Sequence, residues 1–162
     1  MSAREQASWH RLGRWLLRAI ASVGFLGYVP VAPGTAGTLG AIPLALALHR
    51  TPLTWRLVII TALIFLAVAV SRRAEQLFGE RDSQRIVIDE VVGFLIASLT
   101  IPFQPAFWFG AFIAFRIFDT VKPYPARRLA RVPGGWGVVL DDVVAGSYTL
   151  IGLFIFSTLV RL

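Results

Sequence analysis

Long apolar runs separated by short polar stretches dominate the chain. The longest uninterrupted run covers residues 57–70, and the others cover 39–48, 91–101, 106–118 and 143–160. At about 1.5 Å per residue, residues 57–70 reach only about 22 Å, so flanking residues must complete a crossing of about 30 Å. The pattern predicts an all-α, small polytopic membrane protein with about five membrane-embedded helices. Proline-containing breaks at 51–52 and 102–105 separate these segments, and the second break predicts a helical hairpin.

The composition supports this class. The chain has 162 residues, of which 56% are hydrophobic and only 15% charged, and its mean hydropathy is +0.70. These values lie outside the usual range of soluble proteins, and the length suits one domain, residues 1–162, embedded in a membrane. Cysteine is absent, so neither a disulfide framework nor a thiolate metal site is available.

The first 23 residues predict an amphipathic helix that lies in the membrane interface. Apolar side chains recur near helical spacing, at Trp9, Leu12, Leu16 and Ile20, while basic side chains take another face, at Arg11, Arg14 and Arg18. This arrangement is typical of an in-plane helix. An ordinary amphipathic helix packed on protein is the alternative. The arginines run too far into the segment for a cleaved signal peptide, so we expect it to be retained.

The basic residues indicate orientation and partner. The net charge is +7, yet the basic residues form no single tract and few aromatic residues lie among them, so we expect no nucleic-acid partner. Most lie in the N-terminal arm and in the stretches 71–85 and 119–142, and the positive-inside rule places these three regions on the cytoplasmic side. The expected partner is a membrane with anionic headgroups. The oligomeric state stays open.

Five of the nine acidic residues are expected at one membrane edge. Asp89 and Glu90 precede one apolar run, Asp141 and Asp142 precede another, and Asp119 lies between them. Carboxylates beside hydrophobic helices are costly to desolvate unless water or a cation binds them. Helix capping explains one acid of a pair more readily than two, because adjacent like charges repel. Without cysteine, and with only His10 and His49, the oxygen-rich set favours Mg²⁺ over zinc.

Two cations and two hydroxyls accompany the acids. Lys122 is the only lysine among 16 basic residues, and a compact ammonium is a point-charge phosphate binder. Arg116 is either a second phosphate ligand or an interfacial residue with its stem in the membrane. The segment 32–40 places Thr35 and Thr38 before a helix, where backbone amides bind anions, although a simple turn with Thr38 as a cap is the alternative. A metal bound to clustered carboxylates at a membrane edge predicts a phosphorylated substrate.

Four motifs together resemble the phosphatidylglycerophosphatase A family. They are Pro30-Val-Ala-Pro-Gly-Thr-Ala-Gly-Thr-Leu39, Asp89-Glu-Val-Val-Gly93, Phe115-Arg-Ile-Phe-Asp-Thr-Val-Lys-Pro-Tyr-Pro125 and Gly134-Gly-Trp-Gly-Val-Val-Leu-Asp-Asp-Val-Val-Ala-Gly146. The resemblance spans about residues 20–160. It implies a Mg²⁺-dependent phosphatase of the bacterial inner membrane that converts phosphatidylglycerophosphate to phosphatidylglycerol, with its active site on the cytoplasmic side.

The combined interpretation assigns a role to each candidate residue. Asp89, Glu90, Asp141 and Asp142 hold one or two Mg²⁺ ions, and Asp119 is a further ligand or activates the attacking water. Asp119, Asp141 and Asp142 are the candidate catalytic residues. The substrate-binding candidates are Thr35, Thr38, Arg116 and Lys122. Direct water attack and a phospho-aspartate intermediate both stay open.

Two other classes fit parts of the pattern. An ion-coupled carrier also places acids and a lysine in membrane helices, but its acids are expected nearer the bilayer midplane and within inverted repeats. A CDP-alcohol phosphotransferase is also a metal-dependent phospholipid enzyme, but its longer spaced aspartate motif within one segment is absent.

Overall fold

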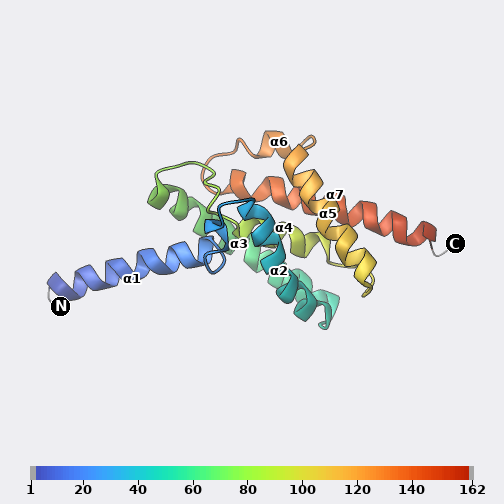
Figure 1. Ribbon diagram of the computed structural model, residues 1–162, viewed down its shortest axis with the longest axis horizontal. Helices are drawn as coiled ribbons and strands as arrows, with labels where there is room; N and C mark the ends of the chain where they lie inside the picture. Colours follow the sequence, from blue (N-terminus) through green and yellow to red (C-terminus); the bar gives the residue numbers. More distant parts are fainter. Residues whose placement is uncertain (1–2, 161–162) are drawn as a thin grey trace.

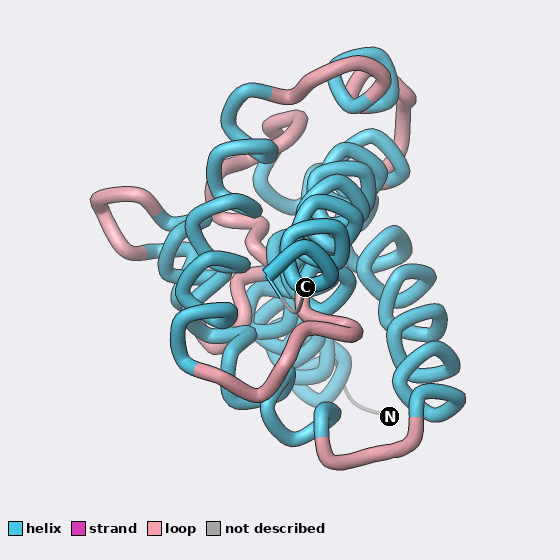
Figure 2. The backbone as a smooth tube through the Cα atoms, turned by 90° about the vertical axis from the view of Figure 1, so that its right-hand side faces the viewer, coloured by secondary structure: helices cyan, strands magenta, loops and turns pink. Residues whose placement is uncertain are grey.

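The chain folds into a bundle of helices. The computed structural model describes residues 3–160 and contains no strand in that range. Its α-helices are α1 (Ala3–Ala21), α2 (Pro33–His49), α3 (Leu53–Phe78), α4 (Ile88–Ala97), α5 (Pro105–Val121), α6 (Ala126–Leu129) and α7 (Trp136–Val160), with a short 3-10 helix, η1 (Leu26–Tyr28). Figures 1 and 2 show this all-helical arrangement. The predicted all-α class is therefore confirmed.

Helix α4 is short and lies at the centre of the bundle. It contacts α2, α3, α5 and α7, and Phe94 and Leu95 are among the largest fully buried side chains. The sequence 91–101 predicted a membrane-embedded segment, but the 10 residues of α4 extend only about 15 Å, about half of a hydrocarbon core. Burial inside the bundle explains why α4 is apolar on all sides after Glu90.

Two helices are long and apolar enough to cross a membrane, by length and composition. They are α3 and the part of α7 from Trp136 to Leu159. Large hydrophobic side chains are also exposed on the outer faces of α3, α5 and α7, including Phe65, Phe109, Ile151, Phe154 and Phe156. Such a surface suits contact with lipid, so the protein is membrane-associated. The total of about five membrane-embedded helices stays a prediction.

Three helices have boundaries that the apolar runs do not mark. The start of α2 is Pro33, a residue favoured in a first helical turn, so Gly34, Thr35 and Thr38 lie in the helix rather than in a loop before it. Helix α3 continues beyond residue 70, because its next residues still bury small side chains against the bundle, and it ends at Gly79 in the left-handed conformation (φ 68°).

The last helix also begins earlier than its apolar run. Because α7 starts at Trp136, Asp141 and Asp142 lie inside its second turn rather than before it. In Figure 2, α7 points toward the viewer with the other helices around it.

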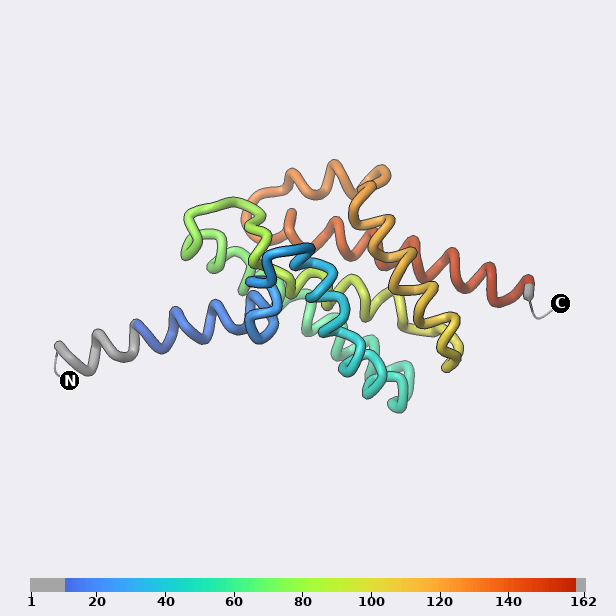
Figure 3. The backbone as a smooth tube through the Cα atoms, in the orientation of Figure 1, coloured from blue at the N-terminus to red at the C-terminus, as the bar shows by residue number. Residues whose placement is uncertain are grey.

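At one end of the bundle, residues 11–21 of α1 lead away from the body (Figure 3). Among residues 11–21, the side chains of Leu12, Trp15, Leu16 and Ile20 are exposed, whereas Ala21 is buried and its carbonyl accepts a hydrogen bond from the Val87 amide at 2.9 Å. The predicted contribution of Trp9 lies outside the side chains that the structure describes, as do the two residues at each end of the predicted domain. The interfacial role of residues 1–23 stays a prediction.

Candidate active site at the meeting of four helices

A close crossing of α4 and α7 brings the two acid pairs together. A Cβ at Gly146 would lie 2.2 Å from the Gly93 carbonyl oxygen, and a Cβ at Gly93 would lie 2.8 Å from the Asp142 carbonyl oxygen. Only glycine therefore permits these two backbones to approach so closely. Each glycine follows an acid by four residues, Asp89 in α4 and Asp142 in α7, so the crossing lies one turn beyond the acids and sets their separation.

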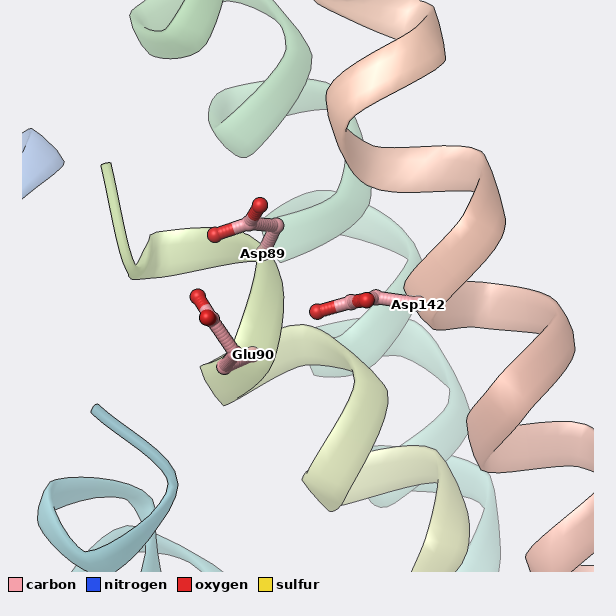
Figure 4. Close-up of side chains that lie close together, drawn as sticks. All are labelled: Asp89, Glu90 and Asp142. Atoms are coloured by element: carbon pink, nitrogen blue, oxygen red, sulfur yellow. The ribbon is translucent and has the colours of Figure 1, made fainter. Parts of the chain in front are cut away.

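Three carboxylates converge at this crossing. Asp89, Glu90 and Asp142 each offer one oxygen, and the three oxygens all lie within 4.8 Å of one another. Figure 4 shows them gathered beside the first turn of α4, with Asp142 reaching across from α7. Asp89 is 7% exposed and Asp142 only 3%. Three carboxylates gathered in this way suit a bound cation.

One oxygen of each predicted metal ligand lacks a hydrogen-bond partner in the described part of the chain. Each of the four acids has one buried oxygen without a hydrogen-bond partner: Asp89 Oδ1, Glu90 Oε2, Asp141 Oδ1 and Asp142 Oδ2. Burial, followed by the charges of Glu90 and Asp142, raises the pKa of Asp89 well above its usual range. An oxygen-coordinated divalent cation offsets both costs, so these residues fit such an ion.

Arg116, near the C-terminal end of α5, places a positive charge beside the acids. The guanidinium of Arg116 lies 2.8 Å from Asp119 on the same helix and 3.8 Å from Glu90 on α4. All three side chains are largely buried, with 21% of Arg116 exposed. Arg116 therefore contacts the acidic cluster directly, and its structural role is to link α5 to α4.

Lys122 separates the roles of the second acid pair. Its ammonium donates a hydrogen bond to Asp141 and forms an ion pair with it, whereas Asp142 joins the three-carboxylate group. Burial lowers the pKa of Lys122, but the hydrogen bond and the charge of Asp141 outweigh this effect and raise the pKa above its usual range. The side chain therefore stays protonated at neutral pH.

The start of α2 forms the remaining wall. Gly34 lies so close to the cluster that a Cβ there would be 2.1 Å from Glu90 Oε1 and about 3 Å from the Arg116 guanidinium. Thr35 is half-buried in the same turn. Thr38 is fully buried, and its hydroxyl donates to the Gly34 carbonyl at 2.9 Å, so in this structure it supports the Gly34 turn. The substrate contacts predicted for both threonines stay predictions.

The structure thus brings together most of the predicted site residues, although the sequence assigned no role to three glycines. Gly34, Gly93 and Gly146 set the distances between α2, α4 and α7. One signal for two of them was available in the sequence. The spacing of an acid and a glycine four residues apart occurs twice, and this spacing places both residues on the same helix face.

Comparisons with known proteins identify the family of the chain. Residues 19–157 match the family described as Phosphatidylglycerophosphatase A. This chain belongs to that family. The resemblance drawn from the four motifs is therefore confirmed, and the chain is a member of a phosphatase family.

Three relatives cover most of the chain. A Bacteroides thetaiotaomicron protein with the provisional name phosphatidylinositol-3-phosphatase is 40% identical over 77% of this chain and 83% of its own length. The phosphatidylglycerophosphatase A of Escherichia coli is 36% identical over 85% of this chain and 77% of its own length. The Haemophilus influenzae protein of the same name is 36% identical over 82% and 84%. No solved structure matches the chain significantly.

Proposed function

We propose that this protein hydrolyses the terminal phosphate of phosphatidylglycerophosphate, giving phosphatidylglycerol and inorganic phosphate. The observation that carries the proposal is the convergence of Asp89, Glu90 and Asp142 beside two cations, Arg116 and Lys122. Carboxylates that hold a cation, together with side chains that neutralise an anion, are the parts that phosphoryl transfer requires. The names of two relatives add the lipid substrate.

The proposed cofactor is Mg²⁺, held by Asp89, Glu90 and Asp142, with Asp141 as a neighbouring ligand. When bound, this ion polarises the phosphoryl group and offsets the negative charge that develops during transfer. The ligand set supports it, because every donor is a carboxylate oxygen and the described residues include no histidine in the cluster.

The residues around the ion complete the proposed reaction. Lys122 and Arg116 neutralise the phosphate oxygens, and Thr35 contacts the phosphate from the start of α2, where Thr38 supports the turn. Asp119 accepts a proton from the attacking water, the water oxygen bonds to phosphorus, and the ester P–O bond breaks. The protonated Asp119 then gives this proton to the leaving glycerol oxygen, which restores the carboxylate, and free phosphate is released.

The site is proposed to face the cytoplasm from the inner membrane. The basic stretches 71–85 and 119–142 flank it, and positively charged loops favour that side. An ion carrier is not favoured, because the family is one of phosphatases. A second substrate candidate comes from the first relative, whose name specifies a 3-phosphorylated inositol lipid. Both lipids present a phosphomonoester beyond a phosphodiester.

Phosphate release from purified protein tests the proposal. Phosphatidylglycerophosphate should release phosphate in Mg²⁺, EDTA should abolish release, and added Mg²⁺ should restore it. Asp142→Asn should reduce kcat at least about 100-fold, because it removes one carboxylate ligand. Glu80→Gln is the matched control, since Glu80 is exposed and glutamine keeps a side-chain oxygen that can accept the hydrogen bond from Ser83.

Other outcomes would change the assignment in defined ways. If the protein released phosphate from phosphatidylinositol 3-phosphate and not from phosphatidylglycerophosphate, the inositol lipid would become the assigned substrate. Full activity in EDTA would exclude the metal, and unchanged activity of Asp142→Asn would remove that residue from the site.

A further inference from the structure

A cationic cavity lies beside the acidic cluster, and Lys122 is the one residue of its lining that the reaction described above uses. Its volume is about 470 Å³, and residues 121–131 supply its walls. Four of the lining side chains are basic, Lys122, Arg127, Arg128 and Arg131, and none is acidic. The chain contains no acidic residue between Asp119 and Asp141. The lining of the cavity therefore carries only positive charges, and the nearby carboxylates of Asp82 and Asp141 act on Lys122.

The arginines of this cavity are available to a ligand. Within the described part of the chain, none of the three forms an ion pair with a carboxylate. Arg127 donates one hydrogen bond to the Val121 carbonyl at 3.2 Å. Arg131 contributes only its backbone carbonyl, which accepts from Arg81 at 2.8 Å. This contact fixes the segment and leaves the guanidinium groups of Arg128 and Arg131 exposed.

Lys122 joins the cavity to the acidic cluster. It lines the cavity, and its ammonium is hydrogen-bonded to Asp141 in the cluster. An anion in the cavity and a phosphate at the cluster would therefore lie on either side of one side chain. A ligand with two phosphate groups separated by a short linker suits this arrangement.

An exposed apolar stripe leads along α5 to the same cavity. Its side chains are four residues apart and so share one helix face: Phe109, Ile113, Ile117 and Val121, which are 69%, 41%, 53% and 56% exposed. Tyr124, which is 75% exposed, continues the stripe at the cavity wall. A soluble phosphate needs no such surface, whereas acyl chains do.

We infer that the cavity binds the phosphodiester of the substrate lipid while its acyl chains lie on the α5 stripe. The terminal phosphate then reaches past Lys122 to the acidic cluster. The placement of the terminal phosphate at the acidic cluster rests on the proposed function. Substrate choice follows from it, because a lipid with a phosphodiester and a distal phosphomonoester occupies both places at once.

The inference is tested first by binding, without catalysis. The probe is acyl-labelled fluorescent phosphatidylglycerol in detergent micelles with EDTA, since this lipid has the phosphodiester and lacks the terminal phosphate. Arg128→Gln/Arg131→Gln should weaken binding about tenfold, which is about 1.4 kcal/mol. Arg128→Lys/Arg131→Lys should recover part of it. Arg73→Gln is the matched control, because Arg73 is exposed outside the cavity, and its affinity should stay within twofold of the wild type.

Hydrolysis separates this inference from the proposed function. The double Gln variant should raise KM for phosphatidylglycerophosphate about tenfold and leave kcat within twofold, which also shows that it folds. An unchanged KM with normal turnover would show that the cavity does not bind the substrate. The proposed phosphatase activity would still stand. No turnover in any protein, with arginine-dependent binding, would overturn the proposed function alone.

Two further results would overturn parts of the inference. Equal binding of the probe to the wild type and the double variant, or no binding to either, would exclude the cavity. If deacylated glycerophosphoglycerol competed as well as intact phosphatidylglycerol, the stripe on α5 would have no role in recognition.

Discussion

Lys122 occupies a backbone conformation that few non-glycine residues adopt. Its φ is 48°, at the end of α5, and the ion pair with Asp141 is the contact formed by its side chain. The strained position is thus used to direct an ammonium at a nearly buried carboxylate. Because Asp141 is engaged by Lys122, Asp142 is the member of the pair that is available to the other acids.

Substitution of Lys122 should separate charge from shape. Lys122→Met leaves the Asp141 carboxylate without its cation, so we expect kcat/KM for the lipid to fall about 100-fold, which corresponds to about 2.7 kcal/mol. Lys122→Arg keeps the charge but replaces a compact donor by a planar fork, so an intermediate loss is expected. Steady-state phosphate release measures both. Wild-type turnover by Lys122→Arg would show that positive charge alone is required.

At the scale of elements, the crossing of α4 and α7 controls the distance between the acid pairs. The nearest atoms to a Cβ at Gly146 are the Gly93 carbonyl at 2.2 Å and the Ile96 Cβ at 3.1 Å. Neither atom belongs to the flexible end of a long side chain. The two helices must therefore move apart if a methyl group is added.

Gly146→Ala should accordingly lower both stability and activity. Overpacking of a tight contact costs about 1–3 kcal/mol, and separation of the helices draws Asp142 away from Asp89. Gly152→Ala on the same helix is the control, because its Cβ would have nothing within 4 Å and alanine favours a helix by up to about 1 kcal/mol. Thermal unfolding in detergent measures the stability of both variants, and phosphate release measures their activity. Equal melting temperatures would contradict the close crossing.

The sequence predicted the helical class and the candidate acids, but not all of the helix boundaries or the separate contacts of the acids. Apolar runs mark helices well where the helix is apolar throughout, as in residues 57–70 of α3. They fail where small residues extend a helix, as at Gly34 in α2, because burial of small groups against a neighbour has no periodic signal.

The separate contacts of Asp141 and Asp142 were also beyond the sequence. Neighbouring residues on a helix point about 100° apart, so one faces Lys122 and the other faces α4. Which residue faces which partner depends on the rotation of α7, and that rotation is set by its glycine contacts. The cationic cavity depends in the same way on how the chain folds back after α5.

At the scale of the whole molecule, the two ends of the bundle differ in chemistry. The acidic cluster and the basic segment 121–131 lie at one end. At the other end, Arg56 donates to the carbonyls of His49, Thr51 and Leu99, and so joins the ends of α2 and α4 to the start of α3. The predicted orientation places the first end in the cytoplasm and the second on the opposite side.

Cysteine labelling tests this orientation. The chain has no cysteine, so one introduced thiol is a unique label. Glu80→Cys at the first end and Gln104→Cys at the other are both exposed positions. A membrane-impermeant maleimide should label Gln104→Cys in intact spheroplasts and label Glu80→Cys only after permeabilisation. The reverse pattern would invert the topology.

The contrast in burial between the two charged regions has a consequence for ionic strength. Mobile ions screen exposed charges over about 8–10 Å but hardly reach buried ones, and the cavity arginines are exposed whereas Asp89 and Asp142 are buried. Raising NaCl from about 50 to 500 mM at fixed Mg²⁺ should therefore increase KM severalfold while kcat changes little. Both constants can be measured on lipid micelles. The salt content of the surroundings would then control how readily the enzyme captures a lipid, but not how fast it cleaves a lipid that is already bound.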